Sequence, residues 1–461
     1  MIRIDALPDD VLLEIFDFHV GVRYGGKTGM EAWQSLVRVC RSWRSLVFGS
    51  PRRLNLRLYC TPKTPARDTL DVWPALPLLI SGYMTSESSV TDNVIAALGQ
   101  TDRVCQVVLF DLASWQLEKV LAAMQVSFPE LTELQLFSND KTPVVPDSIL
   151  GGSAPRLRVL NLTSISFPGL PKLLLSAAHL VRLHLYGIPR SGYHDISPEV
   201  IVPPLSALSN LEAFSLEFQS PPSRTDWEIP SLPPPKRSIL PALSRLYFKG
   251  VTEYLEALVS HIDTPQLDQV HISFFNQIDF DCPQLAQLIN CTPTLRARDE
   301  AHVQFDDTTA SIRLRYSTSK IRIVDLLIEV ACGEPDWQLS SIEQVCSFLR
   351  PLSAVEDLHI DHRYSELVWK GDAIENTLWL ELLLPFITVK NLYLSKDFAA
   401  GIASGLQELV GITTVLPSLQ NIFVEELEPS GPFQENIGRF VAARQLSDHL
   451  IAISDWDKYS M

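Results

Sequence analysis

A short apolar pattern recurs along most of the chain. In each copy an apolar residue is followed three and five positions later by two more. Five close copies are Leu131-Leu134-Leu136, Leu157-Leu160-Leu162, Leu180-Leu183-Leu185, Leu211-Phe214-Leu216 and Leu243-Leu246-Phe248. Looser copies begin at Val104, Leu267, Val355, Val389 and Leu419. Because residues two apart in a strand lie on one face, the last two residues of each copy predict a short strand with one buried face.

Helical patterns lie between these predicted strands. The spacing i, i+3, i+4, i+7 occurs at Leu117, Val120, Leu121 and Met124, and again at Leu255, Leu258, Val259 and Ile262. One strand and one helix cannot bury their own apolar faces, so successive units must stack. The pattern predicts a curved α/β solenoid with strands on its concave side, from about residue 100 to 425.

Other stretches stand apart from this pattern. Leu54, Leu56 and Leu58 alternate as in a strand, a polar connection then reaches Asp71, and a second buried strand is predicted within 73–80. Residues 219–241 are rich in Pro and Ser and predict a loop outside the array, with a polyproline ligand as the alternative. Residues 296–316 fit a hairpin or an irregular repeat equally well. Residues 446–461 either cap the array or extend from it.

The N-terminal region has a different, helical pattern. Pro8 suits the first turn of a helix, and the acidic residues at 9 and 10 suit the positive end of its dipole. The apolar stripe that follows consists of Leu7, Val11, Leu12, Ile15 and Phe16. A further helix is predicted from one apolar face formed by Leu36, Cys40, Trp43 and Val47, with Gly49, Ser50 and Pro51 ending it. On that face Cys40 is interpreted as a small buried thiol.

These N-terminal residues resemble a known motif. Leu7-Pro8-Asp9-Asp10, Leu13-Glu14-Ile15-Phe16 and the stretch from Leu36 to Arg44 are similar to the F-box. The resemblance implies a three-helix module that docks on the Skp adaptor of cullin-based SCF ubiquitin ligases. The sequence departs from the common pattern in a longer, Gly-rich loop at 20–30.

The array resembles leucine-rich-repeat proteins. The resemblance is degenerate, since the Asn typical of such repeats is present at Asn139 but is replaced in later copies by Ile165, Ile188, Gln219 and Val251. An F-box followed by loose repeats is similar to the F-box families expanded in fungi. The implied fold class is α/β, with an all-α module at 1–53 and an irregular solenoid at 54–461.

Composition narrows the class of partner. The chain has 461 residues, enough for at least two structural units or one extended array. Residues 1–58 hold nine Lys or Arg against six Asp or Glu, a net of +3, so the total of −16 leaves −19 on the rest. An acidic body disfavours nucleic acid, whose phosphates need Lys and Arg. Seven irregularly spaced cysteines and the absence of an apolar run of about 18 residues predict a reduced chain in the cytoplasm or nucleus, without a membrane span.

Two local patterns resemble sites of known chemistry. Residues 21–28 satisfy GxxxxGK[ST], the phosphate-binding loop, but that loop needs a buried strand before it, and here a helical stripe precedes it. His359 and Asp361 share a strand face and could begin a metal site, yet no further ligand stands at a recognisable spacing, so a solvated surface is favoured. We predict no metal, no cofactor and no catalytic residues.

The residues between each inward pair offer a binding surface. This middle column reads Gln135, Asn161, His184, Ser215, Tyr247, His271, His359, Tyr393 and Phe423. Aromatic side chains and Arg are typical of interface anchors, although strand propensity alone accounts equally well for Tyr and His here. The predicted target-binding residues are Arg182, His184, Tyr186, Arg245, Tyr247, Lys249, His271, His359, Tyr393 and Phe423.

These observations lead to a hypothesis of function. The chain is predicted to be a non-catalytic substrate-recognition subunit of an SCF-type ligase, with the Skp adaptor, and through it a cullin, at one end and a protein target on the array. The residues expected to dock the adaptor or pack the module are Leu7, Pro8, Val11, Leu12, Ile15, Phe16, Leu36, Val39 and Trp43. The alternatives are a repeat scaffold without ubiquitin chemistry and a nucleotide-dependent switch that uses the loop at 21–28.

Overall fold

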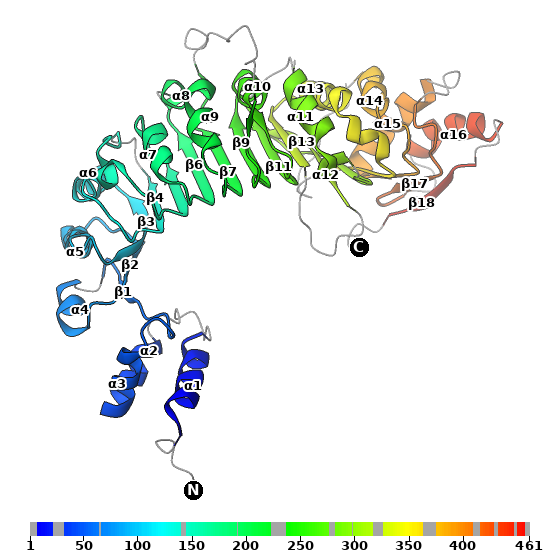
Figure 1. Ribbon diagram of the computed structural model, residues 1–461. Coiled ribbons are helices and arrows are strands. Elements are labelled where there is room, and N and C mark those ends of the chain that lie inside the picture. Colours follow the sequence, from blue (N-terminus) through cyan, green and yellow to red (C-terminus); the bar gives the residue numbers. More distant parts are fainter. Residues whose placement is uncertain are drawn as a thin grey trace. The chain divides into compact units, whose positions relative to one another are not determined.

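The structure is a computed structural model of the chain (Figure 1). It describes residues 7–21, 32–63, 66–139, 144–190, 192–222, 237–275, 282–296, 298–316, 326–362, 375–408, 415–427, 432–446 and 450–456. The chain divides into two compact units, Met1–Ile196 (unit 1) and Ser197–Met461 (unit 2). No helix among the described residues is long and apolar enough to cross a membrane.

Unit 1 begins with three helices, α1 (Asp9–Gly21), α2 (Ala32–Val39) and α3 (Arg41–Gly49). The helix predicted after Pro8 is confirmed, and the amide of Leu12 donates to the carbonyl of Pro8. The single helix predicted across residues 36–47 is wrong, because the chain breaks at Cys40. That residue has extended backbone, and its sulfur accepts a hydrogen bond from the amide of Trp43 at 3.4 Å. The predicted buried thiol is therefore an exposed N-cap of α3.

This cap gives a first prediction. Replacing Cys40 with Ser should stabilise α3 by about 0.5–1 kcal/mol, because a hydroxyl oxygen accepts the Trp43 amide proton better than sulfur does. Hydrogen exchange of the α3 amides should become slower. Cys291→Ser is the matched control, since this exposed thiol lies at the last residue of its helix and caps no N-terminus. Unchanged or faster exchange in α3 would contradict the prediction that a hydroxyl at position 40 caps this helix better than the sulfur does.

The rest of unit 1 alternates strands with helices. Its strands are β1 (Leu58–Cys60), β2 (Leu78–Tyr83), β3 (Val104–Leu112), β4 (Glu133–Ser138), β5 (Val159–Thr163) and β6 (Arg182–Ile188). Its helices are α4 (Ala66–Val72), α5 (Ser88–Leu98), α6 (Ser114–Ala123), the 3-10 helix η3 (Ile149–Gly152), α7 (Leu170–Ser176) and α8 (Gly192–Asp195). The strands pair in chain order, all parallel. The strand predicted within 73–80 starts only at Leu78, and the predicted connection to Asp71 contains α4.

Unit 2 continues the same alternation. Its strands are β7 (Ala213–Phe218), β8 (Ser238–Ile239), β9 (Arg245–Gly250), β10 (Ile262–Asp263), β11 (Gln269–Phe274), β12 (Glu300–Phe305), β13 (Thr309–Arg315), β14 (Leu326–Ala331), β15 (Asp357–His362), β16 (Asn391–Leu394), β17 (Asn421–Val424) and β18 (Ala452–Asp455). Its helices are α9 (Pro198–Ser206), α10 (Thr252–His261), α11 (Pro283–Cys291), α12 (Pro293–Arg296), α13 (Pro335–Phe348), the 3-10 helix η4 (Arg350–Ala354), α14 (Asn376–Leu383), α15 (Lys396–Glu408) and α16 (Pro432–Gln445).

The sheet of unit 2 is parallel except at one insertion. Its strand order is β7-β9-β11-β14-β13-β12-β15-β16-β17-β18, while β8 and β10 form a separate pair. Strand β13 runs antiparallel to both β12 and β14, which in turn are parallel to β15 and β11. The stretch 296–316 is therefore a hairpin, which is one of the two structures that its sequence allows. The described part of 446–461 includes β18, which pairs with β17.

All ten apolar copies noted in the sequence coincide with strands. In each unit the helices cover one face of the sheet (Figure 1), and the inward pairs, such as Leu134 and Leu136, are buried beneath them. Burying one such side chain contributes roughly 1.5–3 kcal/mol, so the repeated pair is the main support of each strand. The structure is thus a mixed α/β fold with long, mostly parallel sheets. The Pro-rich stretch 219–241 follows β7, and its residues 223–236 lie outside the described residues.

Candidate functional site

The face of each sheet opposite the helices, here called the open face, carries the predicted middle column. In unit 1, β-pairing aligns Gln135 with Asn161 and Asn161 with His184. In unit 2 the aligned column is Ser215, Tyr247, His271, Leu327, Arg313, His302, His359, Tyr393, Phe423 and Ser454. The members expected from the repeat spacing are all present, and the strands β12, β13 and β14 add His302, Arg313 and Leu327.

Four rings of this column in unit 2 form one continuous stack. His302 and His359 lie with centroids 4.3 Å apart and planes 9° apart, and His359 lies 4.1 Å from Tyr393 at 3°. Tyr393 stacks on Phe423 at 4.6 Å and 10°. Because neighbouring strands lie about 4.8 Å apart, rings at one register position reach stacking distance without strain.

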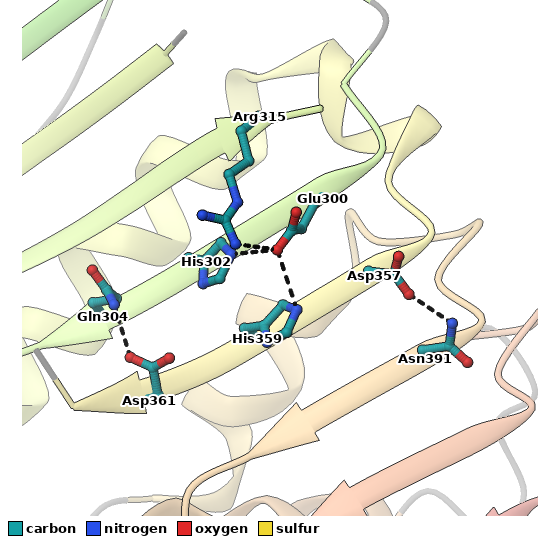
Figure 2. Close-up of polar contacts among 8 residues, drawn as sticks. All are labelled: Glu300, His302, Gln304, Arg315, Asp357, His359, Asp361 and Asn391. Atoms are coloured by element: carbon teal, nitrogen blue, oxygen red, sulfur yellow. Dashed lines mark hydrogen bonds and ion pairs between the residues drawn. The ribbon is translucent and has the colours of Figure 1, made fainter. Parts of the chain in front are cut away.

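A buried carboxylate lies at one end of the stack. Glu300 Oε1 accepts from Arg315 Nη2 at 2.5 Å and from His302 Nε2 at 2.7 Å, and His359 Nε2 lies 3.5 Å from the same oxygen (Figure 2). Burial by itself raises the pKa of Glu300, but the hydrogen bonds from His302 and Arg315 outweigh it and lower this pKa to about 2. The carboxylate therefore stays charged and holds in place His302 on its own strand β12 and Arg315 on the neighbouring strand β13.

Glu300, His302 and His359 form a cluster whose ligand atoms all lie within 4.8 Å of one another. Two imidazoles that hold one metal ion must each point a nitrogen lone pair at it, so the ion lies near both ring planes at about 2.0–2.1 Å from each nitrogen. The stacked rings lie in nearly parallel planes, which no single ion can share at that distance. Arg315 also places a positive charge on the carboxylate. The arrangement fits a hydrogen-bonded cluster and does not fit a metal held by both rings.

Two further polar columns flank the stack (Figure 2). Asn391 Nδ2 donates to Asp357 Oδ1 at 2.6 Å, and Asn421 Nδ2 donates to Asn391 Oδ1 at 2.7 Å. Burial raises the pKa of Asp357, and the hydrogen bond from Asn391 lowers it by less. The negative charge of Glu300 raises this pKa further. On the other side Gln304 Nε2 donates to Asp361 Oδ1 at 2.9 Å.

The solvated surface predicted for His359 and Asp361 is wrong, because both side chains are buried. His359 is covered by the stacked rings and by Trp456, whose ring centroid lies 5.6 Å away, and Asp361 is paired with Gln304. Tyr393, another predicted target-binding residue, is buried as well. Phe423 at the far end of the stack is partly exposed.

The other predicted target-binding residues lie on the open face in two groups. In unit 2, Lys249 Nζ pairs with Glu217 at 3.2 Å, His271 Nε2 lies 3.0 Å from Glu329, and the ring of Tyr247 meets that of His271 edge-on. In unit 1, the rings of His184 and Tyr186 stack at 5.7 Å. The two remaining residues, Arg182 and Arg245, are exposed at the first positions of β6 and β9.

Several residues of this surface escaped the sequence prediction. They are Glu217, Glu300, His302, Glu329, Arg315, Asp357, Asn391 and Trp456. The alternation of Glu300, His302 and Gln304 was a usable signal, since it places three polar side chains on one strand face. Nothing local to Trp456 indicates that it folds over β15 and β16.

The N-terminal helices sort the predicted adaptor residues into two sets. Leu12, Phe16 and Leu36 are buried inside the module, where the ring of Phe16 lies 4.7 Å from that of Trp43. The exposed set contains Pro8, Val11, Ile15 and Val39, while Leu7 and Trp43 are intermediate. The module contacts the chain that follows it, because Trp33 Nε1 donates to the carbonyl of Arg57 at 3.1 Å and its ring meets that of Trp73.

The structure does not provide the strand that a nucleotide-binding loop at 21–28 would need before it. A phosphate-binding loop follows a buried strand, whereas the segment before Gly21 is helix α1. Residues 22–28 of the pattern lie outside the described residues.

No family model matches the chain, and no curated protein matches it. Among solved structures, the chain is similar to the leucine-rich repeat-containing protein LegL7 from Legionella pneumophila, with 12% identity and a TM-score of 0.27 over 84% of this chain and 97% of that one.

Proposed function

We propose that the chain is a substrate-recognition subunit of an SCF-type ubiquitin ligase, which binds the Skp adaptor through α1–α3 and a protein target through the open face. The observation that carries the proposal is a second apolar stripe on α1. Val11, Ile15 and Phe18 are spaced i, i+4, i+7 and are 39%, 42% and 73% exposed. The packing of the module is already supplied by the neighbouring Leu12 and Phe16.

An exposed apolar helix stripe favours a helical or groove-forming partner. Large apolar side chains that share one helix face and find no cover within their own fold mark an interaction surface. Val39, at the last position of α2, is also exposed and adds to the apolar surface of the module. These positions fall within the stretch that resembles the F-box, which is why the Skp adaptor is the partner proposed.

The open face supplies the second half of the proposed function. Its aromatic, imidazole and paired charged side chains match the composition of interface anchors. Held on a rigid sheet, a target bound there would lie near a ubiquitin donor recruited through the adaptor, which raises the effective concentration of the reacting groups. The chain itself contributes no chemistry in this proposal.

The test is co-purification of the full-length chain with the Skp adaptor. Wild-type protein should retain the adaptor, and the double variant Val11→Glu/Ile15→Glu should lose at least about tenfold in affinity, because charges would be buried at the contact. Val200→Glu is the matched control, since this residue is likewise apolar, helical and 43% exposed, but lies on α9 of unit 2. Equal adaptor binding by the double variant and the control would refute the docking surface.

A repeat-built interaction scaffold is the second candidate. The open face favours it independently of the adaptor, because its paired side chains lie in unit 2 and do not depend on α1–α3. Failure of the wild-type chain to bind the adaptor would leave this candidate in place.

A further inference from the structure

Trp456 covers the ring stack of unit 2 from beside β18, which lies two positions from β16 and three from β15 in the sheet. It follows β18, yet its ring centroid lies 5.5 Å from that of Tyr393 on β16 and 5.6 Å from that of His359 on β15. The two interplanar angles are 61° and 59°, so the indole rests at a tilt on the ring stack. Only 7% of Trp456 is exposed.

The strand that delivers this ring is weakly held. β18 is a four-residue strand at the edge of the sheet, and of its residues three are exposed and one is intermediate. It is tied by strand pairing with β17, by the amide of Trp456 donating to the carbonyl of Val424, and by Asp455 accepting from the amide of Leu427. The buried apolar side chains here are those of the two residues that flank the strand, Ile451 and Trp456. Segments with few buried contacts and exposed backbone pairing open readily.

The surface beneath Trp456 differs from an ordinary apolar core. Its floor consists of His359 and Tyr393, and the rest of the face holds Glu300, Asp357 and Asn391 in hydrogen-bonded pairs. The indole Nε1 is buried and has no hydrogen-bond partner among the described residues. A core position optimised for tryptophan would satisfy that donor, because an unpaired buried N–H is costly. His359 and Tyr393 therefore contact the indole ring of Trp456 through its apolar surface and not through its N–H group.

From this geometry we propose that the face over β15–β17 is a receptor for an extended peptide segment carrying an aromatic residue, and that β18 with Trp456 occupies it within the same chain. A target segment would pair with the edge of β17 as β18 does, and would place its aromatic ring on His359 and Tyr393. Main-chain pairing supplies affinity in this mode, and the ring contact supplies selectivity. The inference names the kind of target that the proposed function requires, and so rests on it.

The experiment uses a fluorescein-labelled peptide of residues 450–456, LIAISDW, and the full-length chain. Trp456→Ala protein should bind the peptide at least about tenfold more tightly than wild type, because an occupied site lowers apparent affinity by the fraction of molecules that are open. Trp337→Ala, which removes an exposed tryptophan from α13, is the matched control and should bind as wild type does. Fluorescence anisotropy reports the binding.

Two altered peptides test the chemistry of recognition. The peptide with Phe in place of Trp should bind within about threefold of the original, because Nε1 makes no hydrogen bond that could be lost. The peptide with Ala there should lose at least about tenfold, since it has no ring to place on the stack.

A deletion variant tests the same site without relying on the Trp456→Ala substitution alone. Removal of residues 447–461 should open the site as Trp456→Ala does, with the thermal transition of the chain retained. If both variants stay folded and neither binds the peptide, Trp456 is only a core residue and the proposal fails. Unfolding of both variants would also overturn it, because a displaceable strand cannot be required for the fold. The assay contains no adaptor, so loss of adaptor binding with peptide binding retained would refute the ligase role alone.

Discussion

Replacing Glu300 with Gln is expected to lower the free energy of unfolding of unit 2 by about 3 kcal/mol, because removing one partner of a buried ion pair leaves the other charge uncompensated. Arg315 would lose its carboxylate partner, and His302 would lose a charged acceptor. Chemical denaturation of the full-length chain measures the change. The substitution keeps the shape of the side chain, so the loss reports charge and hydrogen bonding.

The same variant should alter the pH dependence of stability. Glu300 has a pKa of about 2 in the folded chain, below its ordinary value of 4.5. A carboxyl whose pKa is lowered by folding stabilises the fold above the unfolded pKa, and this stability is lost as pH falls through the folded pKa. Wild-type protein should therefore lose stability between pH 4.5 and about 2 more steeply than Glu300→Gln.

Glu217→Gln provides the control for both measurements. It removes a carboxylate from the open face of the same unit, but its partner Lys249 is partly solvated. Such pairs contribute less than about 1 kcal/mol, so this variant should stay close to wild type. If Glu300→Gln were no more destabilised than Glu217→Gln, the Glu300 cluster would not hold the sheet together.

Phe305→Ala is expected to cost about 4 kcal/mol, the loss typical of truncating a buried aromatic side chain. Phe305 is the last residue of β12 and is fully buried, and its ring lies 5.3 Å from Phe398 on α15 and 6.3 Å from Trp379 on α14. It therefore joins the inserted hairpin to the helices that cover the following repeats. Thermal and chemical denaturation should both show the loss.

The control for this variant is Leu384→Ala, just after α14. Leu384 is a large apolar residue on the same side of the unit but is exposed, so its truncation should change stability by less than about 1 kcal/mol. Similar effects of the two substitutions would contradict the role assigned to Phe305.

The strands were predictable because their signal is local. Residue pairs such as Leu160 and Leu162, two positions apart, specify a strand and its buried face without reference to the rest of the chain. Their regular recurrence also predicted which residues of the open face would align. The break at Cys40 was not predictable in this way, because Cys counts as apolar in the helical stripe, and only its backbone conformation shows it to be a cap.

The Glu300 cluster and Trp456 depend on contacts between distant segments. Glu300 and Arg315 meet because β12 and β13 pair antiparallel in one particular register, and a shift by one residue would separate them. Trp456 directly follows the short strand β18, and its place on Tyr393 follows from the sheet order, which no local pattern contains. The fold was thus largely predictable, and the most buried part of the site was not.

The inserted strands of unit 2 have a consequence for the order in which the chain folds. Parallel repeats can add one after another, each on the strand formed just before it. β12 cannot add to the strand that precedes it in sequence, because its neighbours in the sheet are β13 and β15. The second neighbour of β11 is β14, which follows the β12–β13 hairpin in sequence, so that edge of β11 stays unpaired until β14 is in place. Pairing between segments far apart in sequence is slow to form. We therefore expect growth from β7 to stop at β11 until the β12–β14 meander has assembled as a nucleus of its own, from which β15–β18 can then extend.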